Sequence, residues 1–290
     1  MSHPKELASA FEAARLLHKK HGKSYYFATK LFPRDTRLAT YALYAFFRVP
    51  DEIVDNSPIH NNQDLKEVKS QLNDWRDKWR EAYDTQTSDD SILRVTTYVF
   101  HRYKIPYQYS EDFLAAMTLD LEKSEYATYA ELESYMYGSA AVVGLMMSHV
   151  IGFSDERALD HAKQLGYAMQ LTNFLRDIDE DFIQRGRVYM PRDELAAHGL
   201  SMEDIAARRF SPDFKRFMQW QSERARSLYR QSDQGIPMLN PHGRFPVRVA
   251  GALYGAILDK IEQQDWNIFA GRAKTSTTEK LKLAAREWRK

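Results

Sequence analysis

Hydrophobic residues recur at three- and four-residue intervals along almost the whole chain. This spacing places them on one face of an α-helix, whereas the strict alternation of apolar and polar residues that is typical of a β-strand is scarce. The pattern predicts helices over residues 5–20, 35–55, 63–84, 89–103, 108–123, 129–151, 155–184, 211–232, 242–266 and 276–288. The fold class that follows is all-α.

Proline, glycine and polar clusters separate these predicted helices. The longest polar stretch, NSPIHNNQDL over 56–65, is predicted to be a surface loop, and no repeat, low-complexity tract or flexible linker divides the 290 residues. Hydrophobic residues make up 43% of the chain, which is enough for one sizeable core. We therefore expect a single all-α domain over residues 1–290.

Charge and cysteine content narrow the function classes. Lys and Arg number 41 against 40 Asp and Glu, so no overall field favours nucleic acid or an anionic membrane as a partner. Cysteine is absent, which excludes disulfides and thiolate metal sites and fits a reducing compartment. The N-terminal segment has no apolar core of the signal-peptide type, and the most apolar run, 140–153, is too short to span a bilayer. The expectation is a cytoplasmic protein.

The segment QLTNFLRDIDED, residues 170–181, carries polar side chains in an unexpected place. Gln170, Asn173, Asp177 and Asp181 share one face of the predicted helix, because successive members are separated by three, four and four residues. Apolar residues cover the neighbouring faces of the same helix. A polar stripe bounded by apolar residues is difficult to place on the outer surface, so we infer that it faces an internal cavity.

A second stripe of this kind lies in YALYAFFRVPDEIVD, residues 41–55. Its members, four, three and four residues apart, are Tyr44, Arg48, Asp51 and Asp55. One pair of aspartates four residues apart is most often a solvated helix face. Two stripes, each accompanied by an arginine and each embedded in apolar sequence, favour a shared internal site instead.

The residue types in the two stripes favour a metal ion together with an anion. Carboxylates that face each other across a cavity repel unless cations lie between them. Asp and Asn oxygens suit Mg²⁺, with Mn²⁺ as an alternative ion. Arginine beside metal ligands indicates an anion as well, because guanidinium binds phosphate in a forked geometry. Apolar walls around such a site fit an allylic diphosphate, whose carbocation they would shield from water while aromatic faces stabilise it.

Five segments in one order resemble the squalene/phytoene synthase family: RVPDEIVD (48–55), YMYGSAAVVG (135–144), QLTNFLRDIDED (170–181), GRVYMP (186–191) and RVAGALYGAILDKIE (248–262). The similarity extends from HGKSYYFATKLFP at 21–33 to NIFAGRAKTSTTEKLKL at 267–283, which is most of the chain. Each segment alone is modest evidence, but the five in order are specific. The resemblance implies an isoprenoid-synthase helical bundle around a central cavity and the head-to-head joining of two prenyl diphosphates.

The resemblance also implies roles for individual residues. The metal ligands that it implies are Asp51, Asp55, Asn173, Asp177 and Asp181. The positions that it implies at the diphosphates and their allylic ends are His21, Gly22, Lys23, Ser24, Tyr44, Arg48, Gln170, Arg176, Tyr254 and Arg272. The residues expected to act in catalysis are Asp51, Asp55, Asp177, Asp181, Tyr44 and Arg48. Lys280 is a further candidate beside Arg272.

Several positions depart from the family pattern or need a reason. The family's first motif usually has two adjacent acids of one kind; here the second is Glu52, about 100° off the stripe and outside the primary metal shell. Pro50 lies inside a predicted helix and is expected to kink it near Phe46. Ser139 stands where the family commonly has valine. Gly144, which costs a helix about 1 kcal/mol, makes sense if its missing side chain leaves room for an isoprenoid tail.

The resemblance implies a phytoene synthase activity, in which two geranylgeranyl diphosphates condense through a cyclopropyl diphosphate. The alternatives within the family are a dehydrosqualene, hydroxysqualene or squalene synthase that uses two farnesyl diphosphates. A non-enzyme alternative is a catalytically inactive helical assembly factor, against which the five metal-type side chains argue. Because the substrate tails and the product are insoluble in water, we expect peripheral contact with a lipid membrane; protein partners stay open.

The segment KSYYFATKLF, residues 23–32, bears on substrate length. If this segment is helical, either Tyr25 and Thr29 face the cavity or the register that buries Lys30 applies, which is costly. We therefore expect Tyr25 and Thr29 to face inward. Because Thr29 is small, it would leave a long channel together with Ser139 and Gly144, which favours a twenty-carbon substrate over a fifteen-carbon one.

Overall fold

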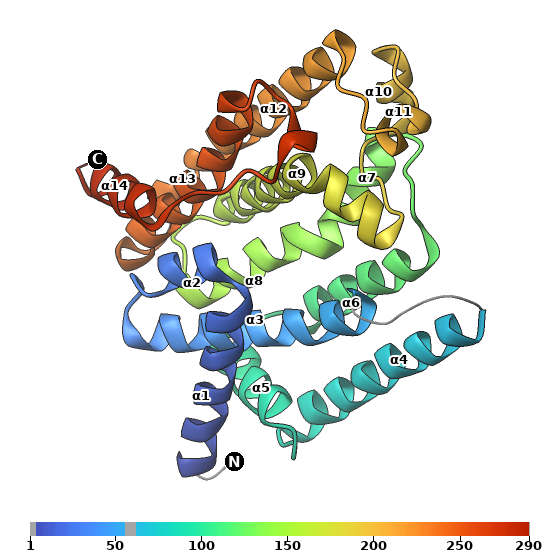
Figure 1. Ribbon diagram of the computed structural model, residues 1–290. Coiled ribbons are helices and arrows are strands. Elements are labelled where there is room, and N and C mark those ends of the chain that lie inside the picture. Colours follow the sequence, from blue (N-terminus) through green and yellow to red (C-terminus); the bar gives the residue numbers. More distant parts are fainter. Residues whose placement is uncertain (1–3, 56–61, 290) are drawn as a thin grey trace.

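The protein is built from α-helices that surround one long central helix (Figure 1). The computed structural model describes residues 4–55 and 62–289. Its longer helices are α1 (Pro4–His21), α3 (Arg34–Asp55), α4 (Asn62–Thr85), α5 (Ser91–Tyr103), α6 (Tyr107–Glu122), α8 (Val142–Ile151), α9 (Arg157–Arg185), α12 (Pro212–Asp233), α13 (Pro241–Gln263) and α14 (Thr277–Trp288). The shorter ones are α2 (Lys23–Thr29), α7 (Tyr129–Met136), η1 (Tyr137–Ala141), α10 (Arg192–Ala197), α11 (Met202–Ala206), η2 (Ile236–Met238) and η3 (Ile268–Ala270). Within the described residues the only strand-like pairings are two isolated bridges, which confirms the all-α class.

The observed helices follow the predicted ones closely, with both ends within three residues for all but one range. The exception is 129–151, which divides into α7, the π-helical turn η1 and α8. The pattern missed the short helices α2, α10 and α11 because each presents too few turns for a periodic signal. Of the predicted loop at 56–65, residues 56–61 lie outside the described residues, and Asn62 already begins α4.

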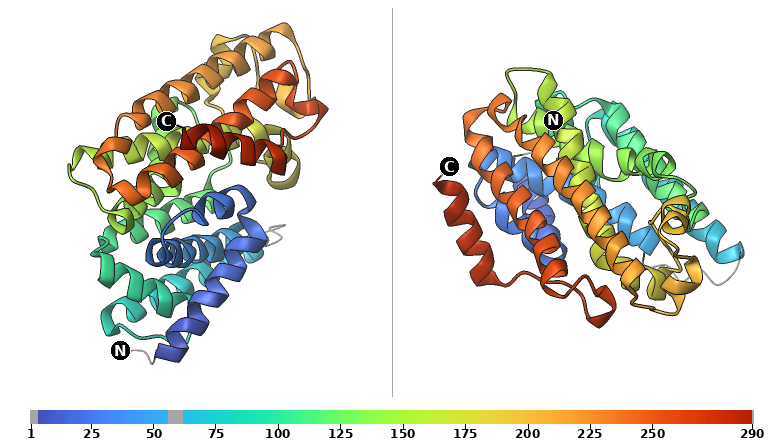
Figure 2. Two further views of the ribbon diagram at one scale, coloured as in Figure 1. Left: turned by 90° about the vertical axis from the view of Figure 1, so that its left-hand side faces the viewer. Right: turned by 90° about the horizontal axis from the view of Figure 1, so that it is seen from above.

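Helix α9 runs through the middle of the bundle and packs against α8, α12 and α13 (Figures 1 and 2). A large hydrophobic cluster extends from α1 to the segment before α14 and includes the fully buried rings of Phe46, Trp79 and Phe100. One continuous core of this extent is what a single domain requires; the boundary at 1–290 stays a prediction. Among the described residues, no helix combines the length and apolarity needed to cross a bilayer.

Capping residues fix the ends of the helices that border the centre of the molecule. Thr128 accepts a hydrogen bond from the backbone N–H of Glu131 at the start of α7, and Ser276 and Glu279 form a reciprocal capping box at the start of α14. The C-cap of α9 is Gly186, whose φ of 63° is in the left-handed region that favours glycine. This ending returns the following segment, Arg187 included, toward α3.

Pro50 lies inside α3, and the helix continues through it to Asp55. Its ring nitrogen cannot donate to the carbonyl of Phe46, so one hydrogen bond of the helix is lost. The helix nevertheless runs from Arg34 to Asp55 without interruption. Arg48, Asp51 and Asp55 therefore keep the helical spacing on which the sequence argument depends.

Gly144 lines the apolar cavity, and the packing of two helices explains why no side chain fits at this position. A Cβ at Gly144 would lie 2.5 Å from the carbonyl oxygen of Ala162 on α9. The contact is reciprocal, because a Cβ at Gly166 of α9 would lie 2.7 Å from the carbonyl oxygen of Ala140 in η1. The missing side chains therefore let η1 and α8 approach the backbone of α9 closely.

This close approach predicts the response to added methyl groups. Gly144→Ala should lower the free energy of unfolding by about 1–3 kcal/mol, because the backbone of α9 cannot yield as a side chain can. Gly251→Ala in α13 is the matched control: its nearest atom, a methyl carbon of Leu165, is 3.7 Å away, so this change should be neutral or stabilise by about 0.4–1 kcal/mol. Urea unfolding of the two variants measures both values, and equal midpoints would contradict the packing explanation.

Candidate active site

One polar cavity of about 940 Å³ lies between α3 and α9 and extends to the start of α14. It is lined by every residue that the sequence singled out for a site: His21, Gly22, Lys23, Ser24, Tyr44, Arg48, Asp51, Asp55, Gln170, Asn173, Arg176, Asp177, Asp181, Tyr254, Arg272 and Lys280. The fold thus brings together five segments that are far apart in the sequence. Their roles as ligands stay a prediction.

The α3 side of the cavity is organised by Arg48. Its guanidinium donates to the Asp51 carboxylate and, through Nε at 3.1 Å, to Oε1 of Glu52. The same Glu52 oxygen lies 3.2 Å from Nε2 of His21. Glu52 is not among the residues that line the cavity, as its position off the stripe predicted. It acts instead as a link between α1 and Arg48.

Asp55, at the end of α3, is held by two arginines from the end of α9 and the segment after it. Arg185 donates through two nitrogens, each 3.0 Å from an oxygen of Asp55, and Arg187 donates at 3.3 Å. Arg185 also donates to Asp181 at 3.0 Å. These pairs join the two aspartate-rich helices directly at one end of the cavity.

Asp177, in the middle of α9, receives two guanidinium groups. Arg176 donates to both of its oxygens, and Arg272 donates to the same two oxygens at 2.7 and 3.0 Å. Burial alone would raise the pKa of Asp177, but the hydrogen bonds from Arg176 and Arg272 hold it below its ordinary value. Arg272 also lies 3.1 Å from Glu180. The segment before α14 is thereby fastened over α9.

The pKa values of two other carboxylates in the cavity are shifted upward instead. Burial, and after it repulsion from Asp55, raises the pKa of Asp51 to about 6. Burial and repulsion from Asp177 raise the pKa of Asp181 to about 7. Burial thus disfavours the charged form of both carboxylates, and a cation bound beside them would favour that form.

Sequence reasoning missed Asp120, an acid of α6 that lines the same cavity and is 8% exposed. It accepts hydrogen bonds from the hydroxyls of Tyr135 at 2.7 Å and Tyr189 at 3.2 Å, and burial raises its pKa to about 6. The two tyrosine rings stack with Phe174, whose ring centre is 4.1 Å from that of Tyr189. Asp120 thus fixes an aromatic wall of the cavity.

A signal for these missed residues is present in the sequence. Asp120 follows Phe113 and Met117 at helical spacing, so an acid interrupts an apolar stripe of α6, and all three side chains line the cavity. Arg185 continues the stripe of α9 four residues after Asp181. Arg187 lies beyond the helix, where periodicity has no predictive value.

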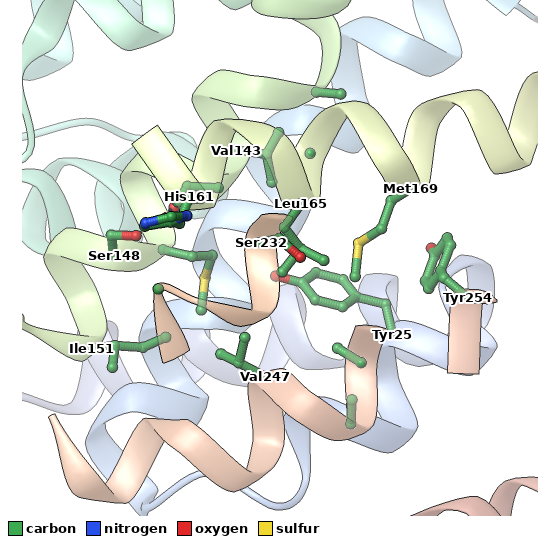
Figure 3. A pocket seen from close by; sticks show the side chains of 18 of the residues that line it. Tyr25, Val143, Ser148, Ile151, His161, Leu165, Met169, Ser232, Val247 and Tyr254 are labelled. Atoms are coloured by element: carbon green, nitrogen blue, oxygen red, sulfur yellow. Dashed lines mark hydrogen bonds between the residues drawn. The ribbon is translucent and has the colours of Figure 1, made fainter. Parts of the chain in front are cut away.

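A second, apolar cavity of about 270 Å³ adjoins the polar one (Figure 3). Tyr25 and Tyr254 lie toward one end of it, and Ile151, Ser148 and His161 lie toward the other. The residues that line both cavities are Tyr25, Tyr44, Phe47, Ser139, Val143, Gln170, Asn173 and Tyr254. A molecule with a charged head and an apolar chain could therefore occupy both at once.

The structure corrects the expected inward face of α2. Tyr25 lines the apolar cavity, as expected, but the α2 and loop residues beyond it are Ala28 and Phe32 rather than Thr29. Thr29 is fully buried and donates a hydrogen bond to the backbone carbonyl of Tyr25 at 2.9 Å. Thr29 faces the protein core, so its size does not set the length of the cavity.

His18 forms an aromatic cluster behind Tyr44. Its ring stacks on that of Tyr44 with centres 3.9 Å apart, and Tyr25, Tyr26 and Tyr41 surround it at 5.2 to 5.6 Å. The side chain is fully buried, and neither ring nitrogen has a hydrogen-bond partner among the described residues. Burial lowers the pKa of His18 to about 3, so the ring is a neutral plate that supports Tyr44.

The oxygen donors of the cavity suit a divalent cation that also takes ligands from outside the protein. Within the described residues no three carboxylates or histidines converge closely enough to hold an ion by themselves. Magnesium commonly takes only one or two carboxylates and completes its shell with water and phosphate oxygens. The separated aspartates of α3 and α9 fit that mode of binding and do not fit an all-protein cage.

The fold and the cavity define the class of protein. A solved dehydrosqualene synthase in complex with a ligand superposes with a TM-score of 0.86 at 26% identity, over 98% of this chain and 97% of that one. The architecture is therefore the helical fold of the isoprenoid synthases, as expected.

The chain belongs to the squalene/phytoene synthase family, whose model matches residues 18–279. It is 35% identical to phytoene synthase 3 of Zea mays over 95% of this chain, which corresponds to 64% of the maize protein. It is 33% identical to the 15-cis-phytoene synthase of Synechococcus elongatus over 95% of this chain and 91% of that protein. Members of this family are prenyltransferases.

The neutral state of His18 predicts a pH dependence of stability. Because its pKa is about 3 in the folded protein and about 6.5 when unfolded, the unfolded chain binds a proton that the folded one refuses. The contribution of His18 to the free energy of unfolding should therefore fall by about 1.4 kcal/mol per pH unit as pH drops from 6.5 to about 3. The raised pKa values of Asp51, Asp120 and Asp181 act in the opposite direction, so this contribution is measured as the difference from a variant that lacks the ring.

His18→Phe keeps a flat ring against Tyr44 and removes the titrating group. Its free energy of unfolding should equal or exceed that of the unsubstituted protein at pH 7, and the advantage should grow as pH is lowered from 6.5 to 4.5. Parallel pH profiles from denaturant unfolding would show that His18 is not buried in the neutral form.

Proposed function

We propose that the protein is a phytoene synthase, which condenses two geranylgeranyl diphosphates head to head through a cyclopropyl diphosphate. The observation that supports this proposal is the junction of a polar, arginine- and aspartate-lined cavity with an apolar one. The relatives named phytoene synthase, at 33 to 35% identity in the two cases above, add to it.

The diphosphates would be bound in the polar cavity by the arginines that now pair with its carboxylates. Arg48 holds Asp51, and Arg176 and Arg272 hold Asp177. Each guanidinium can exchange a carboxylate for a phosphate in the same forked geometry. The segment with Arg272 joins the cavity at the start of α14, together with Lys274 and Lys280, so it would close over a bound diphosphate.

The exchange would free Asp51 and Asp177 for metal binding. With Asp55, Asn173 and Asp181 they are the residues that would hold Mg²⁺. The chemistry that Mg²⁺ supplies when bound is Lewis-acid stabilisation of a departing diphosphate. Mn²⁺ has the same preference for oxygen ligands and would be the alternative ion.

The apolar walls would orient the reacting chains and exclude water. The chain that first loses its diphosphate becomes an allylic cation, and the double bond of the second substrate attacks it. The stacked rings of Tyr135, Phe174 and Tyr189 border the polar cavity, where their faces can stabilise positive charge. The mass balance requires that two diphosphates and two protons leave as the two twenty-carbon chains become phytoene. One diphosphate and one proton leave in each half of the reaction.

The alternatives differ in substrate length and in activity. A dehydrosqualene, hydroxysqualene or squalene synthase would use two farnesyl diphosphates, and the superposition on a dehydrosqualene synthase is the observation that favours this alternative. An inactive assembly factor would turn over neither substrate. The amount of each product formed from labelled geranylgeranyl or farnesyl diphosphate with Mg²⁺ separates all three.

The carboxylates provide the test of the metal site. Asp51→Asn and Asp177→Asn should each lower kcat about a hundredfold or more, because the amide cannot supply the charge that the ion requires. The control is Asp179→Asn, which lies on the same helix but pairs with Arg208 at 2.9 Å and does not line the cavity. Its kcat should be close to normal.

Stability distinguishes this loss from misfolding. Asp51→Asn should not lower Tm in metal-free buffer, because the native surroundings already disfavour the charged carboxylate. Near-normal turnover of either variant in saturating Mg²⁺ would place the metal site elsewhere.

The apolar cavity provides the test of substrate length. In direct competition, the unsubstituted protein should prefer geranylgeranyl over farnesyl diphosphate. Val247 of α13 lines the apolar cavity and does not line the polar one (Figure 3). Val247→Phe should fill this part of the cavity and shift the kcat/KM ratio about tenfold or more toward farnesyl diphosphate.

Val247→Ala is the matched control, since it enlarges the same place and should leave the preference for the longer substrate intact. A preference of the unsubstituted protein for farnesyl diphosphate would overturn the phytoene assignment. An equal effect of both substitutions would show that Val247 does not border the bound chain.

A further inference from the structure

The outer face of α14 carries an apolar stripe. Leu281 and Trp288, seven residues apart on one side of the helix, are 57% and 74% exposed, and the exposed Ala285 lies between them. The opposite side of α14 packs inward, where Leu283 and Ala284 contact a small hydrophobic cluster of α2 and α13. The stripe is therefore on an ordered helix at the edge of the molecule (Figures 1 and 2).

A row of cations runs beside this stripe. Lys282, Arg286 and Arg289 are spaced four and three residues apart and are all exposed. Of the two acids of the helix, only Glu287 offsets one of these cations, Arg286, and Lys282 and Arg289 keep their charge on this face. Glu279 pairs with Lys260 of α13, and Glu287 is 3% exposed and accepts from Arg286 at 3.3 Å. The outer face of α14 is thus apolar on one half and positive on the other.

This face lies next to both cavities. At its beginning, Ser276, Thr277 and Lys280 line the polar cavity. Along its length, the cluster beneath it includes Ala28 and Ala250, which also line the apolar cavity. One layer of side chains from α2 and α13 therefore separates the packed side of α14 from the space that an apolar chain would occupy.

We propose that the outer face of α14 docks the protein on the surface of a membrane that contains anionic lipid. A helix with apolar and basic halves binds in the plane of a lipid interface, with its apolar side chains among the acyl chains and its cations at the phosphates. A second copy of the chain is a poorer partner, because a two-fold contact would bring the same three cations together. The docking follows from this face alone; its use for moving apolar substrate and product rests on the proposed function.

Vesicle flotation of the full-length protein without substrate tests this proposal. The protein should float with phosphatidylcholine vesicles that contain about 30% phosphatidylglycerol, should bind pure phosphatidylcholine weakly, and should be released by salt. The double variant Leu281→Ser/Trp288→Ser should lower the vesicle partition coefficient about tenfold. The control Leu16→Ser/Ile183→Ser removes two side chains that are 51% and 62% exposed elsewhere and should bind as the unsubstituted protein does.

Charge reversal separates the electrostatic half of the face. Lys282→Glu/Arg286→Glu should abolish the preference for anionic vesicles, whereas Lys66→Glu/Lys78→Glu on the distant α4 should largely retain it (Figure 1). Equal vesicle binding by the α14 variants and their controls would overturn the proposal. So would a dimer in light scattering that only the α14 variants dissociate, because the face would then join two copies. Absence of phytoene formation would leave vesicle binding unaffected, so the two proposals fail separately.

Discussion

The burial of two rows of carboxylates on opposite sides of one cavity is the constraint on which the rest of the structure depends. Such an arrangement is unfavourable in itself, and the raised pKa values of Asp51 and Asp181 show that the protein only partly relieves it. Arg48, Arg185 and Arg272 reach in from α3, the end of α9 and the segment before α14. The carboxylates and arginines of the cavity now pair with each other. A bound diphosphate would offer negative charge to the arginines, and its metal ions would offer positive charge to the carboxylates.

Apolar packing keeps this charged cavity open and in a fixed shape. The glycine-mediated approach of η1 and α8 to α9 sets one wall, and the π-helical turn of η1 places Ser139 where the polar and apolar cavities meet. Turns of this kind often occur at functional sites, since they re-aim a side chain without ending the helix. His18 and Asp120 serve the other walls, one by stacking on Tyr44 and one by binding two tyrosine hydroxyls.

The parts of this arrangement that follow a helical period could be predicted from the sequence. The stripes on α3 and α9 needed only the spacing of their polar residues among apolar ones, and the structure places both on one cavity. The reason for Gly144 could not be found in the same way. A single sequence does not distinguish a glycine that leaves room for an isoprenoid chain from one that lets a neighbouring helix pack closely. The prediction that Thr29 faces the cavity was wrong. Its only basis was that Lys30 should not be buried, and in a short helix more than one choice of inward face satisfies that condition.

The central claim is that the two aspartate-rich helices bind one diphosphate group between them while its chain enters the apolar cavity. A crystal structure with Mg²⁺ and a non-reactive thio-analogue of geranylgeranyl diphosphate tests this most directly. We expect a diphosphate with Mg²⁺ in the polar cavity beside Asp51 and Asp177, and an isoprenoid chain that passes Tyr25 and reaches Val247. A diphosphate bound outside this cavity, or a chain that leaves the apolar cavity empty, would contradict it.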